Sequence, residues 1–245
     1  MKTIAAYSIK GGVGKTALAV NLAYSLHQSG RRTLLVDLDP QCAAAYYFRV
    51  QPAAKFKLRD ARKVANRLRA NIRESDYPGL DILPSNLAYR NFDIMLDRMK
   101  KSRRQLGRLL DSLAADYQCV VLDCPPNLTL LSENVFRAAD LLLVPVIPTT
   151  LSLRTLDQLF QFFAAKRLDQ RTIRPFLSMV QSRNRLHHET IASLRKSYPQ
   201  TLESSIPFSV HIERMGLRRQ PALAYAPRHP ATLAYRALCR EILRA

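Results

Sequence analysis

Residues 10–16 read Lys-Gly-Gly-Val-Gly-Lys-Thr, and an apolar run over residues 3–7, Thr-Ile-Ala-Ala-Tyr, comes shortly before them. This window holds three of the seven glycines in the chain, Gly11, Gly12 and Gly14. Glycine lets the backbone curl so that successive N–H groups point inward at an anion. Lys15 then supplies a charge for the outer phosphates, the Thr16 hydroxyl can bind Mg²⁺, and the following helix directs its positive end at the same phosphates. The stretch therefore predicts a nucleoside-triphosphate site between a strand and a helix.

The loop departs from the standard phosphate-binding pattern at two neighbouring positions. The pattern asks for glycine where this chain has Ile9, and it does not ask for a lysine at position 10. A plain glycine turn is the alternative interpretation. The preceding strand, the Gly-Lys-Thr triplet and the following helix all agree with the context that the motif requires, so we favour the phosphate site. Lys10, a second lysine near the start of the loop, is a further departure from the standard pattern that could carry a function of its own.

Length and composition indicate one globular α/β domain over residues 1–245. A hydrophobic content of 47% excludes a disordered chain, and no apolar run approaches the roughly 20 residues of a membrane span. Met1 and Lys2 lead directly into the first expected strand, so we expect no signal peptide and a cytoplasmic location. The four cysteines show no Cys-x-x-Cys spacing, which predicts reduced, structural thiols.

The charge balance is strongly basic. The chain has 38 Lys and Arg against 19 Asp and Glu, a formal net charge of +19. Solubility alone needs a net charge of only about 2–8. Such a field attracts polyanions, chiefly nucleic acid or an anionic membrane, and together with the fold it favours contact with nucleic acid.

Apolar runs and helical periodicity alternate along the chain. Runs that are apolar almost throughout are typical of strands covered on both faces, and their alternation with helices predicts a doubly wound, mostly parallel twisted sheet with helices on both faces. We expect strands at residues 3–7, 33–36, 80–83, 119–122, 141–147 and 175–180. We expect helices over residues 17–27, 155–163 and 231–243, and along a stripe formed by Phe92, Met95, Met99, Leu106, Leu109 and Leu113.

Two acidic motifs complete the predicted site. Residues 34–41 read Leu-Leu-Val-Asp-Leu-Asp-Pro-Gln, which places Asp37 and Asp39 at the carboxyl end of a strand, where ligands of such sheets bind. Residues 120–126 read Val-Val-Leu-Asp-Cys-Pro-Pro, and a strand with Asp123 at its tip is typical of the element that holds Mg²⁺ in phosphate-loop enzymes. Either aspartate alone could cap a helix or shape a turn. The order of the three motifs favours a joint site.

With these motifs the sequence resembles the ParA/MinD family of deviant Walker A P-loop ATPases, and most of all its small ParA-type partitioning and positioning members. The resemblance covers nearly the whole chain and extends to residues 138–140, 205–207 and 234–238. It implies a P-loop NTPase fold, ATP and Mg²⁺ as cofactors, and slow, Mg²⁺-dependent hydrolysis of ATP that a partner stimulates.

The resemblance also implies roles for matched positions. Lys15 would hold the β- and γ-phosphates, Lys10 would reach the partner's ATP in a nucleotide-sandwich homodimer, and Asp39 would position the attacking water. Metal contacts are implied for Thr16, Asp37 and Asp123. The implied nucleotide-binding residues are Lys10, Gly11, Gly12, Val13, Gly14, Lys15, Thr16, Ala17 and Pro207. The segment 179–183 lacks the family's usual acidic residue, which leaves the adenine contacts open.

Basic residues gather in three clusters. A segment like an insertion, about residues 49–75, has nine Lys or Arg between Arg49 and Arg73 and a single acid there, Asp60, and it would suit DNA or an acidic partner equally. A second cluster contains Arg98, Lys100, Lys101, Arg103 and Arg104. The third contains Arg214, Arg218, Arg219 and Arg228 and lies where the family binds DNA without sequence preference. These four are the candidate DNA contacts.

The resulting hypothesis is an ATP-dependent dimer that binds duplex DNA non-specifically, associates with the nucleoid and positions a plasmid, chromosome, protein compartment or storage granule. A small stimulating adaptor with a basic tail is the expected protein partner. The alternative is a membrane-associated MinD-like regulator or envelope-machine ATPase, with the last helix as anchor. Metal binding by His187 and His188, and an iron–sulfur role for Cys124, are weaker alternatives because companion ligands at suitable spacing are missing.

Overall fold

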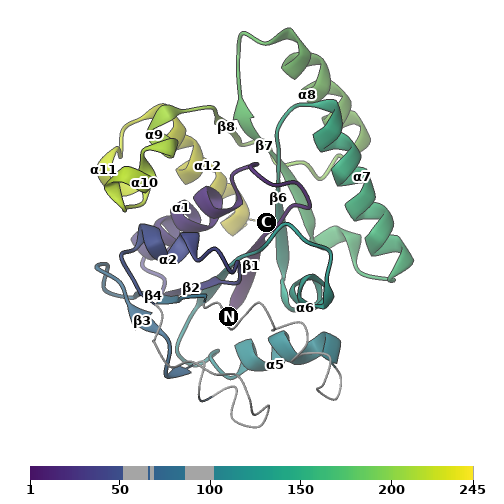
Figure 1. Cartoon of the computed structure of the whole chain (residues 1–245). Helices are drawn as coiled ribbons and strands as arrows, with labels where there is room; N and C mark the ends of the chain where they lie inside the picture. Colours follow the sequence, from purple (N-terminus) through teal and green to yellow (C-terminus); the bar gives the residue numbers. More distant parts are fainter. Residues whose placement is uncertain (52–65, 67–68, 86–101, 245) are drawn as a thin grey trace.

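A computed structural model describes residues 1–51, 66, 69–85 and 102–244, and Figure 1 shows how its elements are arranged. The strands are β1 (Lys2–Ala6), β2 (Thr33–Asp37), β3 (Arg73–Glu74), β4 (Leu80–Leu83), β5 (Cys119–Asp123), β6 (Leu141–Val146), β7 (Ile173–Val180) and β8 (Ser205–Pro207). The helices are α1 (Lys15–Gln28), α2 (Ala43–Tyr47), α5 (Gln105–Asp111), α6 (Leu130–Ala138), α7 (Thr150–Ala165), α8 (Arg185–Ser197), α9 (Val210–Glu213), α10 (Met215–Arg218), α11 (Ala222–Tyr225) and α12 (Pro230–Arg244), with short 3-10 turns at η3 (Ser102–Arg104) and η4 (Gln170–Thr172).

The strands form one sheet in the order β3-β4-β2-β5-β1-β6-β7-β8. Every neighbouring pair is parallel except the short β3, which runs antiparallel to β4 at the edge. The chain leaves β1 toward β2 and later crosses to β6 on its other side, so the winding direction reverses beside β1. Ligands of open α/β sheets bind at such a reversal, outside the carboxyl ends of the strands. The expected doubly wound, mostly parallel sheet is confirmed.

Alternate residues of β1 divide the interior into two cores. Ile4 and Ala6 face a core that includes α1, α2 and α12, whereas Ala5 and the following Tyr7 face a core that includes α5, α6 and α7. Figure 1 shows these helices on opposite sides of the sheet. Residues of β2, β5 and β6 are buried throughout, as their uninterrupted apolar runs require. Helices on both faces are therefore confirmed.

The last helix packs into the core. Its buried residues include Tyr235, Leu238 and Ile242, which all belong to the core beside α1. Packing in the core therefore accounts for the apolar side chains of this helix, which the alternative hypothesis used as a membrane anchor. In the described residues, no helix combines the length and apolarity needed to cross a bilayer.

Some sequence expectations fall outside the described residues. Most of the basic segment 49–75 lies there, as do Phe92, Met95 and Met99 of the predicted helical stripe and Arg98, Lys100 and Lys101 of the second basic cluster. The described end of the stripe is confirmed, because Leu106, Leu109 and Leu113 are buried in and after α5. The sequence patterns did not predict β3, β8 or α9–α11, since these elements have only two to four residues each and show no full period.

Candidate nucleotide-binding site

The glycine loop joins the carboxyl end of β1 to the start of α1. Gly12 has φ 71° and Gly14 has φ 94°, a left-handed backbone that side chains disfavour. Gly14 is the N-cap of α1, and its carbonyl accepts from the Leu18 N–H at 2.9 Å. Gly11 and Gly12 are exposed. The loop therefore presents its backbone to the solvent just ahead of the positive end of α1.

Lys15, the first residue of α1, is buried with 8% of its surface exposed. Its Nζ donates to the Lys10 carbonyl at 3.2 Å, so the ammonium lies under the loop. Burial lowers the pKa of Lys15, while the carboxylates of Asp123 and Asp39 oppose that shift. A partly desolvated cation between a curled backbone and two carboxylates is suited to bind an anion that carries a metal ion.

Lys10 is held within its own chain. Its Nζ donates to the hydroxyl of Ser152 at 3.1 Å, and its backbone N–H donates to Ser8 Oγ at 3.2 Å. Ser152 lies in the first turn of α7, is 3% exposed, and has the Thr149 hydroxyl 3.0 Å away. Sequence patterns did not point to Ser152, which lies 142 residues from Lys10 along the chain.

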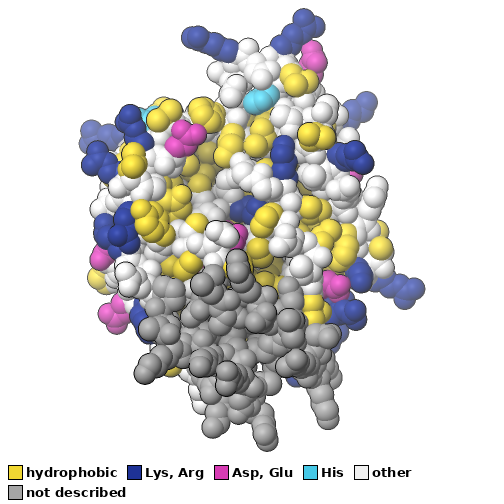
Figure 2. Space-filling view, in the orientation of Figure 1, with side chains coloured by type: hydrophobic (Ala, Val, Ile, Leu, Met, Phe, Trp, Pro, Cys, Tyr) yellow, Lys and Arg dark blue, Asp and Glu magenta, His cyan; other side chains and the backbone are white. Residues whose placement is uncertain are grey.

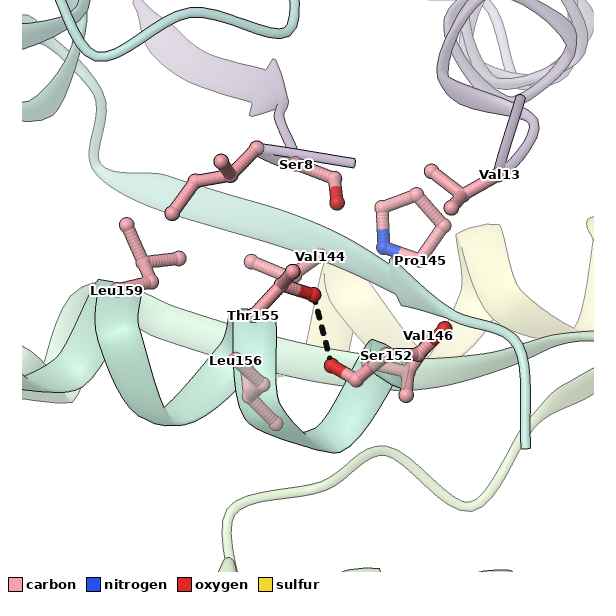
Figure 3. A pocket seen from close by; sticks show the side chains of 10 residues that line it. Ser8, Val13, Val144, Pro145, Val146, Ser152, Thr155, Leu156 and Leu159 are labelled. Atoms are coloured by element: carbon pink, nitrogen blue, oxygen red, sulfur yellow. Dashed lines mark hydrogen bonds between the residues drawn. The ribbon is translucent and has the colours of Figure 1, made fainter. Parts of the chain in front are cut away.

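A small cavity separates the loop from α7. Figure 3 shows Ser8 and Val13 of the loop on one side, Ser152 and Thr155 of α7 on the other, and Pro145 of β6 beside them. Its volume is about 10 Å³, close to the least that one water molecule needs and far below that of a nucleotide. It is a packing gap beneath the loop.

Two aspartates lie at the carboxyl end of β2, Asp37 as its last residue and Asp39 just after it. Asp37 is 1% exposed, and its carboxylate accepts from the N–H of Asp39 at 3.1 Å and of Ala45 at 3.2 Å. Burial raises the pKa of Asp37 from 3.8 to about 7, and the charge of Asp39 adds to that rise. Asp39 is half-buried and accepts from the Gln41 N–H at 2.9 Å. Asp37 thus shapes the turn, and Asp39 lies between that turn and solvent.

Asp123, at the end of β5, is the unusual group of the site. It is fully buried, and neither of its carboxylate oxygens has a hydrogen-bond partner among the described residues. Burial and the neighbouring Asp37 raise its pKa, while the Thr16 hydroxyl beside it and the charge of Lys15 oppose the rise. A buried, unpartnered carboxylate is costly unless a cation joins it.

These groups fit Mg²⁺ that arrives with phosphates. In the described residues, no group of three or more His, Cys, Asp or Glu side chains could hold a metal ion. Mg²⁺ commonly takes one or two protein ligands and fills its other positions with water and substrate phosphates. The unpartnered Asp123 and the Thr16 hydroxyl beside it provide such a sparse set.

A second pocket adjoins the glycine loop and holds about 210 Å³. Gly12, Gly14 and Ala17 form one wall, and Pro207 and Tyr235 contribute to the other. Ser178 and Met179 at the end of β7 also line it, and Ser178 Oγ donates to the Val13 carbonyl at 2.9 Å. The structure thus brings Pro207 to the loop, as expected. Ser178 was missed, although a residue near the carboxyl end of a parallel strand belongs at this edge.

The four candidate DNA contacts lie around α9–α11. Arg214, Arg218 and Arg228 are exposed, and none forms an ion pair with an acid in the described part of the chain. Arg219 differs, because its guanidinium lies 4.6 Å from the centre of the Tyr46 ring. Figure 2 shows Lys and Arg side chains on the flank of the molecule where Figure 1 places these helices.

The remaining special residues have structural explanations. His187 is buried, and its Nδ1 accepts from the Gln181 N–H at 3.1 Å. His188 is exposed and lies 2.7 Å from the Ser182 carbonyl. Cys124 is 1% exposed, and burial raises the pKa of its thiol. All four cysteines are free thiols, as expected.

Comparisons with known proteins agree with this geometry. A family model described as an AAA domain matches residues 1–179. The sporulation initiation inhibitor protein Soj of Bacillus subtilis is 29% identical over 98% of both chains. A putative plasmid partition protein of Borrelia burgdorferi, solved with AMPPNP, has a TM-score of 0.83 and 23% identity over 99% of this chain and 98% of that one. Cobyrinic acid a,c-diamide synthase of Mycobacterium smegmatis, solved with an ATP analogue and magnesium, has a TM-score of 0.77 and 25% identity over 100% of this chain and 95% of that one.

The matched region contains the glycine loop, both acidic motifs and the strands that carry them. The alignment with Soj and the shared fold of the partition protein extend over the remaining helices as well. The chain therefore belongs to the ParA/MinD family of P-loop ATPases.

Proposed function

We propose that this chain binds ATP with Mg²⁺ at the glycine loop and hydrolyses it slowly as a molecular switch. The observation that carries the proposal is the buried Asp123, whose unpartnered oxygens lie beside Thr16 and Lys15. Mg²⁺ on the phosphates would neutralise that carboxylate, and Lys15 would move from the Lys10 carbonyl to the phosphates. Phosphoryl transfer needs mainly such positioning and charge neutralisation.

Asp39 is the proposed water-positioning residue. Unlike Asp37 and Asp123, it is only half-buried, and its one bonded oxygen accepts from a backbone N–H of its own turn. The second oxygen is available to accept from a water molecule. The pocket that contains Pro207 is the proposed site of the adenine base, because it opens beside the loop and has apolar walls.

We also propose that ATP makes the chain dimerise through the face that carries the glycine loop, at the carboxyl ends of the strands, which we call the nucleotide edge. Lys10 is bonded to a neutral serine here, and a phosphate of a partner's ATP would be a stronger partner for its charge. Large apolar side chains that follow strands β5–β8 are exposed around the same edge: Leu128, Leu151, Leu186, Phe208 and Val210. Exposed apolar groups gathered on one edge are expected of a contact surface.

The dimer is proposed to bind duplex DNA without sequence preference. Arg214, Arg218 and Arg228 supply exposed charges that pair with no acid among the described residues, and the net charge of +19 adds attraction at longer range. We further propose an ATPase of one domain that associates with the nucleoid, positions a cargo and is stimulated by an adaptor with a basic tail. The similarity to a plasmid partition protein supports the positioning role.

The test compares two surfaces under the same conditions. The protein is mixed with labelled duplex DNA of unrelated sequences and, separately, with anionic vesicles, each with and without ATP and Mg²⁺. We expect ATP-dependent DNA binding that weakens steeply with salt, with a log–log slope of about −0.9 for each neutralised phosphate. ATP-dependent binding to vesicles without DNA binding at low salt would contradict the proposal and favour the membrane alternative.

The variant for this test is Arg218→Glu with Arg228→Glu, because Arg219 also packs on Tyr46 and its loss would disturb the fold. We expect weaker binding by the same factor on unrelated sequences and a shallower salt slope, by about 1 for each lost contact. The matched control reverses two other exposed arginines, Arg195→Glu with Arg240→Glu, at the same change in net charge. Equal losses in both double variants would show that net charge alone attracts DNA.

A further inference from the structure

A pocket rich in arginine lies by the amino ends of β6 and β7, at the end of the strands opposite to the glycine loop. It holds about 570 Å³, within the range of about 300–1,000 Å³ that is usual for ligand pockets. Arg104 and Arg108 of the α5 segment, Arg137 at the end of α6 and Arg167 after α7 all line it. We call these four residues the arginine pocket. Three segments far apart in sequence thus bring their charges to one hollow.

The arginine pocket has an unbalanced positive charge. All four arginines are exposed, and none pairs with an acidic side chain of the described residues. Two acids also line the pocket. Asp169 is paired with Arg171 at 2.9 Å, and Asp111 pairs with no basic side chain in the described part of the chain. The adjacent Glu133 is shared by Arg103 and Lys166, at 2.9 and 3.3 Å.

The frame beneath the arginine pocket is tied by buried bonds. Asn134 of α6 is fully buried, and its side-chain oxygen accepts from the Gln105 and Leu106 N–H groups at 2.9 and 3.2 Å. Its amide donates to the Ser102 carbonyl at 2.8 Å. The first turn of α5 is therefore fixed on α6. A preorganised frame lowers the entropic cost of binding a ligand.

Arg167 stands at a backbone position where glycine is usual. It has φ 52° just after the C-terminal end of α7, and the next N–H, that of Leu168, bonds back to the Phe163 carbonyl at 2.9 Å. Helices commonly end in this way with glycine in the left-handed position. Here the chain carries an arginine in that conformation instead, and the turn places its side chain in the pocket wall.

We propose that the arginine pocket is the docking site for an acidic peptide segment of a partner protein. Arginine pairs with carboxylates through two parallel N–H donors, and four such groups surround one hollow. A peptide also offers N–H groups to the unpaired Asp111. Duplex DNA suits the pocket less, because its backbone offers only acceptors, which Asp111 repels, and its outer surface is convex. The pocket also repels the basic tail expected of a stimulating adaptor, so the acidic partner is a different contact.

The test uses a fluorescent peptide of repeated Glu-Glu-Leu, about 12 residues long, and measures anisotropy at low and physiological salt. We expect the wild-type protein to bind it and Arg137→Glu with Arg167→Glu to bind at least about tenfold more weakly. Arg137→Lys with Arg167→Lys keeps the charge but loses the paired donors, so an intermediate loss is expected. The matched control, Arg218→Glu with Arg228→Glu, should bind the peptide as the wild type does. Thermal unfolding checks that each variant is folded.

Duplex DNA with ATP is the second probe, and it should separate the two surfaces in the opposite sense. The Arg137 and Arg167 reversal should keep DNA binding, and the Arg218 and Arg228 reversal should lose it. No peptide binding by the wild-type protein at low salt, equal peptide losses in both reversals, or loss of DNA instead of peptide at the arginine pocket would each overturn the proposal. The peptide measurement needs no nucleotide, so its outcome is independent of the proposed ATPase switch.

Discussion

Charged side chains are buried at the carboxyl ends of the strands and exposed at the amino ends. At the carboxyl ends of the strands, Lys15, Asp37 and Asp123 are buried. Burial lowers the pKa of Lys15 and raises the pKa of Asp37 and of Asp123, so it favours the neutral form of each group. At the amino ends of β6 and β7, the four arginines of the arginine pocket are exposed. Burying charge is costly, whereas leaving it in water costs little. The carboxyl ends of the strands therefore suit one ligand whose charges stabilise the ionised forms of the buried groups. The amino ends suit a partner that binds reversibly at the surface.

The comparison predicts that the largest single effect lies at the buried edge. Lys15→Ala removes the cation beneath the loop, so we expect ATP affinity to fall by about 100-fold or more, which corresponds to about 3 kcal/mol. Titration with a fluorescent ATP analogue measures it. Lys196→Ala, an exposed lysine near the end of α8, is the matched control and should bind as the wild type does. Similar affinities for both variants would remove the distinction between the two edges.

The second prediction separates binding from turnover within the buried edge. Asp39→Ala leaves Lys15, Thr16 and Asp123 in place, so ATP should still bind, while hydrolysis should slow by about 100-fold because the attacking water loses its acceptor. Phosphate release under saturating ATP measures turnover, and the titration above measures binding. Hydrolysis at the wild-type rate would show that another group positions the water.

The third prediction concerns the contact between Lys10 and Ser152. Lys10→Ala should weaken the ATP-dependent dimer, because the ammonium that reaches the partner's phosphate is gone. Ser152→Ala should act in the opposite direction, since it removes the hydrogen bond that holds Lys10 in its own chain. One such bond is worth about 1 kcal/mol and each of the two protomers loses one, so the dimer should become about 30-fold tighter. Light scattering over a range of protein concentrations measures both, with Asp39→Ala as background to prevent turnover.

A nucleotide-independent oligomer that ignores both substitutions would rule out this role for Lys10. It would leave the exposed apolar side chains around the nucleotide edge as a contact surface of another kind.

Local motifs explain what the sequence could predict. The glycine loop, Asp37 and Asp123 each belong to a short stretch in which strand, turn and chemistry are adjacent, and the structure brings them together as expected. The strand at residues 80–83 has the predicted bounds, and β1 is displaced by one residue from the predicted 3–7. Apolar runs and glycine context define such elements because both signals are local.

Contacts between distant residues explain what the sequence could not predict. Ser152 meets Lys10 across 142 residues and Ser178 meets Val13 across 165, and no pattern in either stretch points to the other. The arginine pocket has the same origin. Arg104 belonged to a basic cluster without assigned function, and its companions Arg108, Arg137 and Arg167 join it only through the packing of α5, α6 and the end of α7. The segment 49–75, mostly outside the described residues, keeps both of its interpretations.

The smallest expected effect sharpens the comparison through pH. Burial raises the pKa of Asp37 from 3.8 to about 7 and also raises that of Asp123. The folded protein without nucleotide therefore retains protons that the unfolded chain releases between pH values of about 4 and 7. Its free energy of unfolding should fall as pH rises through this window, because folded carboxyl groups must then ionise in a buried place.

Asp123→Asn isolates this term, because it removes the ionisable group and leaves a side chain of nearly the same shape. At pH 8 without nucleotide the variant should be more stable than the wild type by about 1 kcal/mol or more. At pH 5 the difference should shrink, because that pH lies closer to the ordinary pKa of an aspartate in the unfolded chain. Urea unfolding at both pH values measures it, and addition of ATP and Mg²⁺ should stabilise the wild type more than the variant. Asp169→Asn, which changes an exposed aspartate paired with Arg171, is the control and should not raise the free energy of unfolding at pH 8. The two proteins could instead differ in stability by the same amount at both pH values. Ionisation of the buried Asp123 would then cost no stability, and the contrast with the exposed arginine pocket would rest on position alone.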